Sequence, residues 1–260
     1  MVYRTLICAE LGQNHEGDYK LLKDLAYSAG QHADIIKLQY WNTDGIYSKE
    51  DVRYKANKER NGNLSQHLIF ELCKEIKTKL KKQTMVSFFG ASIGALADAT
   101  TSEHIDYLKF ASSEFDVFEE YSKKFGNAKV VTSLGYRGIS KDLEKGPVYL
   151  TCDPAYPSKK GIACIEQMIN LKLHGYVSGY SCHEVGIKHA KLAIAFNAFM
   201  VEKHFTFKSL KEKSTFRDHI GSMDEHELKR LVEERDRIYY ETIDPDHILK
   251  INGKRRLKLS

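Results

Sequence analysis

The chain alternates short apolar runs with longer amphipathic segments. Most of the runs are continuously apolar, which is typical of parallel strands that are covered on both faces. The segments between them repeat apolar residues at spacings of three and four, which predicts helices. We expect eight strands, at residues 5–10, 35–39, 84–89, 107–111, 129–133, 148–152, 176–181 and 199–203. We expect helices at residues 19–29, 65–82, 93–102, 117–125, 159–173, 185–196 and 224–240.

Eight strands that alternate with helices predict an α/β fold, a single-domain (β/α)8 TIM barrel. A doubly wound open sheet is the alternative, but no glycine-rich phosphate-binding sequence follows the first strand to favour it. Residues 140–145, between the fifth and sixth strands, leave room for little more than a turn of helix. The polar segment 41–63 is long for a strand-to-helix link, so we expect a loop over the barrel mouth. We assign residues 1–243 to the barrel and 244–260 to a basic C-terminal tail or linker.

Charge and cysteine content exclude several other classes of protein. The net charge is +5, but residues 250–260 alone hold five basic residues and no acidic one, so the rest of the chain is neutral by count. We therefore expect no nucleic-acid partner. No stretch approaches the roughly 20 apolar residues of a membrane span, so we expect no membrane association. Five cysteines without a close pairing motif predict reduced thiols and a cytoplasmic location.

Polar residues end nearly every predicted strand. They are Glu10, Lys37, Gln39, Ser87, Lys109, Ser112, Glu114, Ser133, Asp153, Tyr156, His183 and His204. In a barrel of this kind the carboxyl ends of the strands form the catalytic face. The pattern as a whole predicts an active site there, although any single member is a weak signal.

Two lysines, Lys37 and Lys109, lie inside apolar strands. Burial of a lone ammonium group is very unfavourable, so each must pair with an acid or bind an anion. Three strand-end serines supply hydroxyl groups: Ser87, Ser112 and Ser133. The alternative is that each lysine pairs with a strand-end acid such as Glu10 or Glu114. Because two lysines and three hydroxyls converge, we favour a site for phosphate and carboxylate groups.

Two histidines, His183 and His204, each follow one of the last two predicted strands. These neighbouring parallel strands would lie about 4.8 Å apart, so both imidazoles can reach one divalent metal ion. Two protein ligands leave the site open to water or to a substrate oxygen. Cys182 is a candidate third ligand, but strand alternation points it away from the face that His183 uses, so core packing is the better interpretation.

At this point the sequence resembles the N-acetylneuraminate (sialic acid) synthase family, which includes the pseudaminic and legionaminic acid synthases. The match runs in consistent order from about residue 6 to residue 231. Its motifs are AELGQNHEG at residues 9–17, IKLQ at 36–39, LKFASSE at 108–114, AYP at 155–157, GYSCH at 179–183 and VEKHFT at 201–206. The first and last of these motifs are specific to the family.

The resemblance implies a metal-dependent transferase that condenses phosphoenolpyruvate with an N-acetyl-aminosugar aldehyde and releases phosphate. It implies that His183 and His204 hold Mn²⁺ or Mg²⁺. It implies that Glu10 acts near the reacting carbons. Residues matching the phosphoenolpyruvate site are Lys37, Ser87, Lys109, Ser112 and Ser133. Residues matching the sugar site are Gln39, Glu114, Tyr156 and Asp218, and with Asp218 we also expect a catalytic contribution.

The resemblance also has departures. Cys182 replaces an acid that usually precedes the first histidine, and Arg217 stands in a changed run beside Asp218. Family synthases usually continue into a small antifreeze-like domain, which caps the active site of the partner subunit and donates an arginine. The chain ends at Ser260, so that domain is naturally absent, on another chain or removed. We expect a homodimer or a separate capping domain, and if the chain is naturally short, Arg217 is a candidate replacement for that arginine.

Two other functions compete with the synthase. A barrel aldolase would form a Schiff base at Lys37 or Lys109, which requires a lysine with a depressed pKa and no metal. A catalytically silent barrel would bind a sugar or a partner enzyme, but it would have no reason to keep Glu10, both lysines and both histidines.

Overall fold

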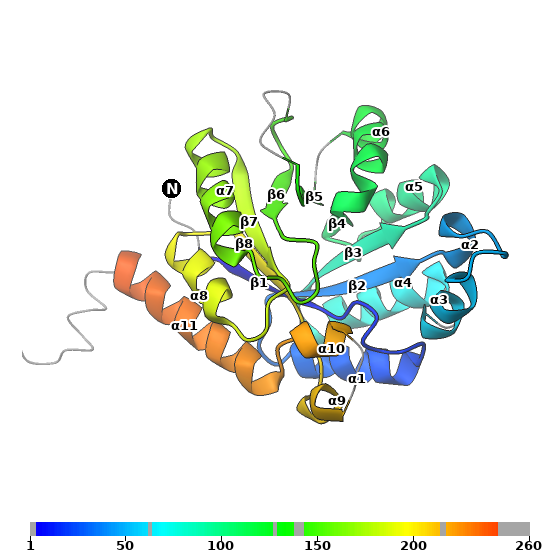
Figure 1. Cartoon of the computed structure of the whole chain (residues 1–260), viewed down its shortest axis with the longest axis horizontal. Helices are drawn as coiled ribbons and strands as arrows, with labels where there is room; N and C mark the ends of the chain where they lie inside the picture. The colour runs from blue at the N-terminus through cyan, green and yellow to red at the C-terminus, as the bar shows by residue number, and fades with distance from the viewer. Residues whose placement is uncertain (1–3, 62–63, 127–128, 138–142, 214–216, 244–260) are drawn as a thin grey trace, which may run out of the picture.

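The computed structural model describes residues 4–61, 64–126, 129–137, 143–213 and 217–243. Eight parallel strands pair in sequence order and close into a barrel (Figure 1). The strands are β1 (Leu6–Glu10), β2 (Ile35–Trp41), β3 (Gln83–Phe89), β4 (Tyr107–Phe110), β5 (Val130–Ser133), β6 (Val148–Thr151), β7 (Val177–Cys182) and β8 (Met200–His204). The barrel closes between β1 and β8, where Glu10 lies opposite His204. The prediction of a (β/α)8 barrel is confirmed.

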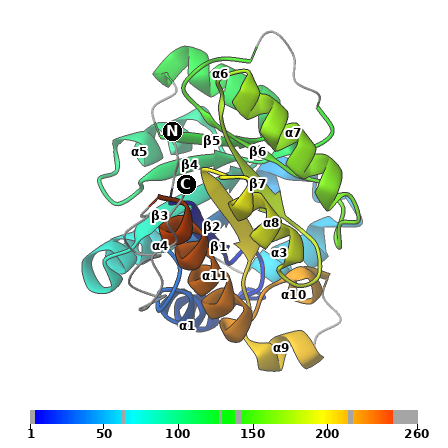
Figure 2. The same ribbon diagram turned by 90° about the vertical axis from the view of Figure 1, so that its left-hand side faces the viewer.

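Helices cover the outside of the barrel. They are α1 (Tyr19–Ala29), α4 (Gln66–Glu75), α5 (Ile93–Thr101), α6 (Phe115–Phe125), α7 (Gly161–Leu173), α8 (Lys188–Ala195) and α11 (Glu225–Ile243). In α1 the apolar spacing of three and four buries one face, and the Asp18 side chain caps the first turn by accepting from the amides of Lys20 and Leu21. The last helix, α11, packs against α8 and α1 (Figure 2).

Two predicted helices extend beyond the bounds that the structure shows. The segment predicted at 65–82 continues beyond α4 as a π-helical turn, η1 (Ile76–Leu80), and stops at Lys81, whose φ is 57°. Such a left-handed residue cannot continue a helix. The segment predicted at 185–196 begins only at Lys188. Between β5 and β6 the described residues contain no helix, in agreement with the short link, although residues 138–142 lie outside them.

The segment 41–63 was expected to be a plain loop, and this was partly wrong. It contains the short helices α2 (Thr43–Ile46) and α3 (Tyr54–Asn61). The sequence of α3 carries no apolar stripe, so periodicity could not show it. Polar contacts hold it instead: Tyr54 and Lys58 both contact the Asp44 carboxylate, at 2.6 and 2.8 Å. Two further short helices that were not predicted, α9 (Lys208–Lys213) and α10 (Arg217–Gly221), follow β8.

The apolar core has two parts. One fills the space between the strands and the outer helices, and it includes Cys182, as expected. The other closes the inside of the barrel with the side chains of Cys8, Ile35, Met85, Val131, Val148, Leu150 and Met200. The inside of the barrel is therefore solid below the carboxyl ends of the strands. No helix in the described part of the chain is long and apolar enough to cross a membrane. The tail assigned to residues 244–260 and the Arg217 side chain lie outside what the structure describes.

Candidate active site

Directly above the apolar plug, the inward-facing side chains become polar. Side chains on a strand alternate between its two faces, so the next inward position is two residues further on. Cys8 is thus followed by Glu10, Ile35 by Lys37, and Met200 by Glu202 and His204. The polar layer forms the floor of a cavity of about 560 Å³ at the carboxyl ends of the strands.

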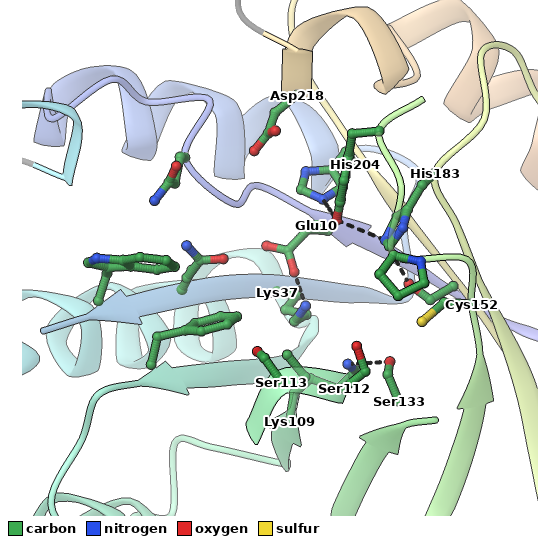
Figure 3. Close-up of a pocket in the computed structure, with 18 of the residues that line it drawn as sticks. Glu10, Lys37, Lys109, Ser112, Ser113, Ser133, Cys152, His183, His204 and Asp218 are labelled. Atoms are coloured by element: carbon green, nitrogen blue, oxygen red, sulfur yellow. Dashed lines mark hydrogen bonds and ion pairs between the residues drawn. The ribbon is translucent and has the colours of Figure 1, made fainter. Parts of the chain in front are cut away.

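Most of the residues predicted for the site line this one cavity. They are Glu10, Lys37, Gln39, Lys109, Ser112, Ser133, Tyr156, His183, His204 and Asp218. Figure 3 shows that the labelled members of this set come from opposite sides of the barrel and point toward one another. The sequence could identify all of them except Asp218 because barrel topology brings strand ends together, whereas Asp218 was expected only from the family resemblance.

Three predicted residues, Ser87, Glu114 and Asp153, are not on the cavity wall. Ser87 is buried, and its hydroxyl has no hydrogen-bond partner among the described residues. Glu114 ends the 3₁₀ turn η2 (Ser112–Glu114), which points successive side chains in different directions. The serines of this turn therefore line the cavity and Glu114 does not; burial raises the pKa of its carboxyl group above the usual value.

Lys37 forms the centre of an ionic cluster on the cavity floor. Its ammonium group contacts the Glu10 carboxylate and lies 3.3 Å from Glu202 Oε2. Burial alone lowers the pKa of Lys37, but the two carboxylates more than reverse this effect and hold its pKa above the usual value. Lys37 is therefore a stable cation at neutral pH. Of the two interpretations of the buried lysines, pairing with a strand-end acid is correct for Lys37, whose partner is Glu10.

Lys109 has a different environment. Its ammonium group donates to Ser133 Oγ at 2.7 Å and to the Phe110 carbonyl at 3.2 Å, and it lies 4.0 Å from Glu202 Oε1. Burial lowers the pKa of Lys109 below the usual value, and Lys37 adds to this, against the opposing effect of Glu202. Because its hydrogen bonds go to neutral groups, Lys109 can still gain from an anion in the cavity.

Glu202 was not predicted as a site residue, yet it lies between the two lysines. It also accepts a hydrogen bond from Ser181 Oγ at 2.9 Å. Burial raises the pKa of the Glu202 carboxyl, but Lys109 and Lys37 outweigh it and hold the pKa below the usual value. A signal was available in the sequence: Glu202 precedes His204 by two residues, so alternation puts both on the same face.

The two histidines point their Nε2 atoms at one place. The Tyr156 hydroxyl lies 2.8 Å from His183 Nε2 and 3.1 Å from His204 Nε2. His183 Nδ1 donates to the Asp153 carbonyl at 2.7 Å, so its Nε2 carries the lone pair. Burial, and then the neighbouring His204, lower the pKa of His183 to about 3, which keeps the imidazole neutral. The Nδ1 atom of His204 has no hydrogen-bond partner in the described part of the chain.

This arrangement suits a metal ion with two protein ligands. A neutral imidazole whose other ring N–H is held by a carbonyl is the usual state of a ligating histidine. Within the described ranges no group of three or more His, Cys, Asp or Glu side chains is placed to hold a metal. The remaining ligands would have to come from water or substrate oxygens.

The rim of the cavity contains residues that the sequence did not single out. They are Gln13, Trp41, Tyr47, Arg53, Asn57, Arg60, Phe89, Ala111, Ser113, Cys152, Pro154 and Ser181. Several belong to the segment 41–63, which does border the mouth as expected. The Gln13 side chain joins this segment to the loop after β1 by donating to Asn61 Oδ1 at 3.0 Å. Trp41 and Phe89 were missed because they end β2 and β3 with aromatic rather than polar side chains, and most of the others, such as Arg53 and Asn57, do not end strands.

Known proteins are similar to this chain in sequence and in fold. An N,N'-diacetyllegionaminic acid synthase of Legionella pneumophila is 28% identical in an alignment that covers 87% of this chain and 70% of that protein. An N-acetylneuraminate-9-phosphate synthase of Mus musculus is 27% identical over 248 residues, covering 87% and 68%. The crystal structure of an N-acetylneuraminic acid synthetase from Leptospira borgpetersenii superposes with a TM-score of 0.76 at 24% identity, over 98% of this chain and 87% of that one. Residues 24–242 match the NeuB family, and the chain belongs to that family.

Proposed function

We propose that this protein condenses phosphoenolpyruvate with an N-acetyl-aminosugar aldehyde of the N-acetylmannosamine type. The products are a nine-carbon 2-keto sugar acid and inorganic phosphate. The named relatives are synthases of acids of this kind, which supports the reaction class. The observation that carries the proposal is that Lys37, Lys109 and the histidine pair share one cavity, so an anionic donor and a carbonyl acceptor can meet there.

The two lysines would bind the donor. Without a ligand, the floor cluster holds two ammonium groups and two carboxylates, Glu10 and Glu202. An incoming phosphate or carboxylate would take over part of this pairing, and Ser112 and Ser133 would donate hydroxyl hydrogen bonds. Held in this way, the phosphate is stabilised as the bond between carbon and the bridging oxygen breaks.

Glu10 would act near the reacting carbons. One of its carboxylate oxygens contacts Lys37, and the other accepts from the Gly12 amide at 2.6 Å. This fixed carboxylate can take a proton from the water that attacks the former enol carbon. The new carbon–carbon bond uses the enol electron pair of the donor, the attacking water supplies the new oxygen, and phosphate is the leaving group.

His183 and His204 fit the role of ligands to a divalent ion, and Mn²⁺ or Mg²⁺ is the proposed cofactor. Such an ion would polarise the aldehyde carbonyl of the acceptor. The protein keeps the His183 imidazole neutral and directs the Nε2 atoms of both histidines to one point. Asp218 is buried on α10 and borders the same cavity, and it would contact the hydroxyl groups of the sugar.

The test is phosphate release from phosphoenolpyruvate with Mn²⁺, across N-acetylated hexosamines and their 6-phosphates. We expect release that requires sugar and metal and disappears in His204→Ala. The matched control is His174→Ala, which removes an exposed imidazole at the end of α7 and should leave release unchanged. Release without sugar or metal, or full release in His204→Ala, contradicts the proposal.

One observation favours a second function, a Schiff-base aldolase. Burial lowers the pKa of Lys109, and a depressed pKa is what a nucleophilic lysine needs. Borohydride reduction in the presence of pyruvate would trap a covalent adduct on Lys109 if this function were correct. We expect no adduct, because the Lys109 ammonium is held by Ser133 and faces Glu202.

A further inference from the structure

A buried carboxylate, Asp153, lies behind the histidine pair and is not itself on the cavity wall. Its Oδ1 accepts from the Tyr136 hydroxyl at 2.8 Å and from the Ala155 amide at 3.2 Å. Its Oδ2 accepts from Ser158 Oγ at 2.9 Å. Among the described residues no lysine or arginine pairs with it, so neutral donors alone hold this charge. A carboxylate in such a place needs a reason for its presence.

These hydrogen bonds keep Asp153 ionised. Burial raises the pKa of its carboxyl, but the bonds from Tyr136, Ala155 and Ser158 outweigh burial and hold the pKa below the usual value. Tyr136, from the segment after β5, and donors from the turn itself therefore converge on one anion. The carboxylate fixes the conformation of residues 153–158.

That same turn surrounds His183. The Asp153 carbonyl accepts the His183 Nδ1 hydrogen at 2.7 Å, and the Ser158 amide donates to the His183 carbonyl at 3.0 Å. Between these two residues, the Tyr156 ring stacks on the imidazole at a centroid distance of 4.1 Å and an interplanar angle of 23°. The turn thus fixes the tautomer, the backbone and the ring plane of His183.

We propose that Asp153 is a positioning residue, whose carboxylate holds this turn so that His183 keeps its proton on Nδ1 and directs the Nε2 lone pair into the cavity. The proposal rests on the proposed function only for its catalytic consequence. The placement of the proton is a property of the protein alone, and it can be measured without substrate or metal.

The first experiment measures the tautomer directly. Protein labelled with ¹⁵N-histidine gives long-range proton–nitrogen correlations that separate the two neutral tautomers, and His183→Gln identifies the His183 signals. We expect the Nδ1–H pattern in the wild type. In Asp153→Ala we expect His183 to move to a mixture with the Nε2–H tautomer. Asp153→Asn, which keeps one acceptor oxygen, should shift less.

The matched control is Asp106→Asn at the opposite end of the barrel. Asp106 likewise accepts from a backbone amide, that of Thr84 at 2.8 Å, and contacts Lys77 at 2.5 Å. Its loss should lower stability without changing the His183 signals. The proposal is overturned if Asp153→Ala retains the wild-type Nδ1–H pattern, or if Asp106→Asn loses it. If Asp153→Ala does not fold, Ser158→Ala and Tyr136→Phe each remove one donor and must each shift the pattern partway, or the proposal fails.

The second experiment measures Mn²⁺ binding by electron paramagnetic resonance. Loss of a group that orients a ligating histidine typically weakens metal binding by about 10- to 100-fold. We expect that weakening in Asp153→Ala and unchanged affinity in Asp106→Asn. Equal affinity in all three proteins would overturn the role of Asp153. Absence of Mn²⁺ binding to the wild type would instead contradict the metal in the proposed function, and the tautomer measurement would still decide the inference.

Discussion

The barrel carries two clusters of two basic and two acidic side chains, one at each end of its strands. At the amino-terminal end, Arg4 and Arg235 meet Asp34 and Asp236. At the carboxyl end, Lys37 and Lys109 meet Glu10 and Glu202. The number and the signs of the charges are the same, but the geometry is not.

The amino-terminal cluster is closed. The fully buried Arg235 donates to Asp34 Oδ2 at 2.6 Å, to the Thr5 carbonyl at 2.7 Å and to Asp236 Oδ1 at 2.7 Å. These bonds join α11 to the beginnings of β1 and β2. The planar guanidinium group suits this fixed arrangement.

The carboxyl-end cluster is open to a ligand. It uses lysines, whose charge is compact and whose donors rotate. Glu202 Oε2 and, in the same inward-facing layer, Ser87 Oγ and His204 Nδ1 have no hydrogen-bond partner among the described residues. Incompletely satisfied buried groups are rare in structural networks and are expected where a ligand binds. From this comparison we expect one cluster to stabilise the fold and the other to bind substrate, as the proposed function requires.

The sharpest test of the stabilising cluster is Arg235→Met. It removes the buried guanidinium from the Thr5 carbonyl and from Asp34 Oδ2, which keeps the Ile7 amide at 2.8 Å, so we expect a loss of about 3–5 kcal/mol in the free energy of unfolding. Urea titration measures this. Phosphate release per folded molecule should stay at the wild-type value, and a proportionate loss of activity would show that the two ends are not independent.

Lys109→Met is the reciprocal test. Loss of one preorganised cation that stabilises the leaving phosphate should lower kcat/KM for phosphoenolpyruvate by about 100- to 1000-fold. The freed carboxylate of Glu202 keeps Lys37 at 3.3 Å and Ser181 at 2.9 Å, so it is not left unpaired. Removal of an ammonium group whose burial is unfavourable should therefore change the free energy of unfolding by no more than about 1 kcal/mol. A loss of unfolding free energy as large as in Arg235→Met would show that the carboxyl-end cluster stabilises the fold.

The sequence predicted the carboxyl-end cluster better than the amino-terminal cluster. Lys37 and Lys109 stand out because a charge interrupts an apolar strand, and barrel topology then places both at one end. The partner of both lysines, Glu202, was missed because it lies in a motif that drew attention to His204. Alternation along β8 contained the missing information.

No comparable sequence pattern indicated the amino-terminal cluster. Arg235 lies in an amphipathic helix among many charged residues, and nothing local shows that it is fully buried. Two of its three partners, Asp34 and the Thr5 carbonyl, are 201 and 230 residues away in sequence. Long-range pairing of this kind depends on how α11 packs on the barrel. Apolar periodicity missed α3 for another reason, because polar contacts rather than an apolar stripe stabilise it.

A pH titration tests how a buried histidine at the carboxyl end of the barrel affects stability. His15, in the loop after β1, is buried, and its Nδ1 accepts the Gly17 amide at 3.0 Å. Burial lowers the pKa of His15 to about 4, from an unfolded value of about 6.5. The unfolded chain therefore binds a proton first as the pH falls, and native stability is lost between about pH 6.5 and pH 4.

The expected loss from this histidine is about 2 kcal/mol between pH 7 and pH 5. His15→Gln should remove that part of the pH dependence of the free energy of unfolding, measured by urea titration at each pH. The exposed His174→Gln serves as the control and should follow the wild-type curve. An unchanged slope in His15→Gln would show that the loop at the carboxyl end of the barrel does not contribute to acid sensitivity.

The smallest expected effect distinguishes the contribution of burial from that of charge within the amino-terminal cluster. Arg4 contacts the same two carboxylates as Arg235, at 3.3 and 2.9 Å, but its side chain is 40% exposed. Solvent screens such a pair, so Arg4→Ala should lower the free energy of unfolding by only about 0.5–1 kcal/mol. A loss that approaches that of Arg235→Met would mean that the number of ion pairs determines the strength of the cluster. The expected small loss would instead assign its stability to the buried, fully hydrogen-bonded guanidinium of Arg235.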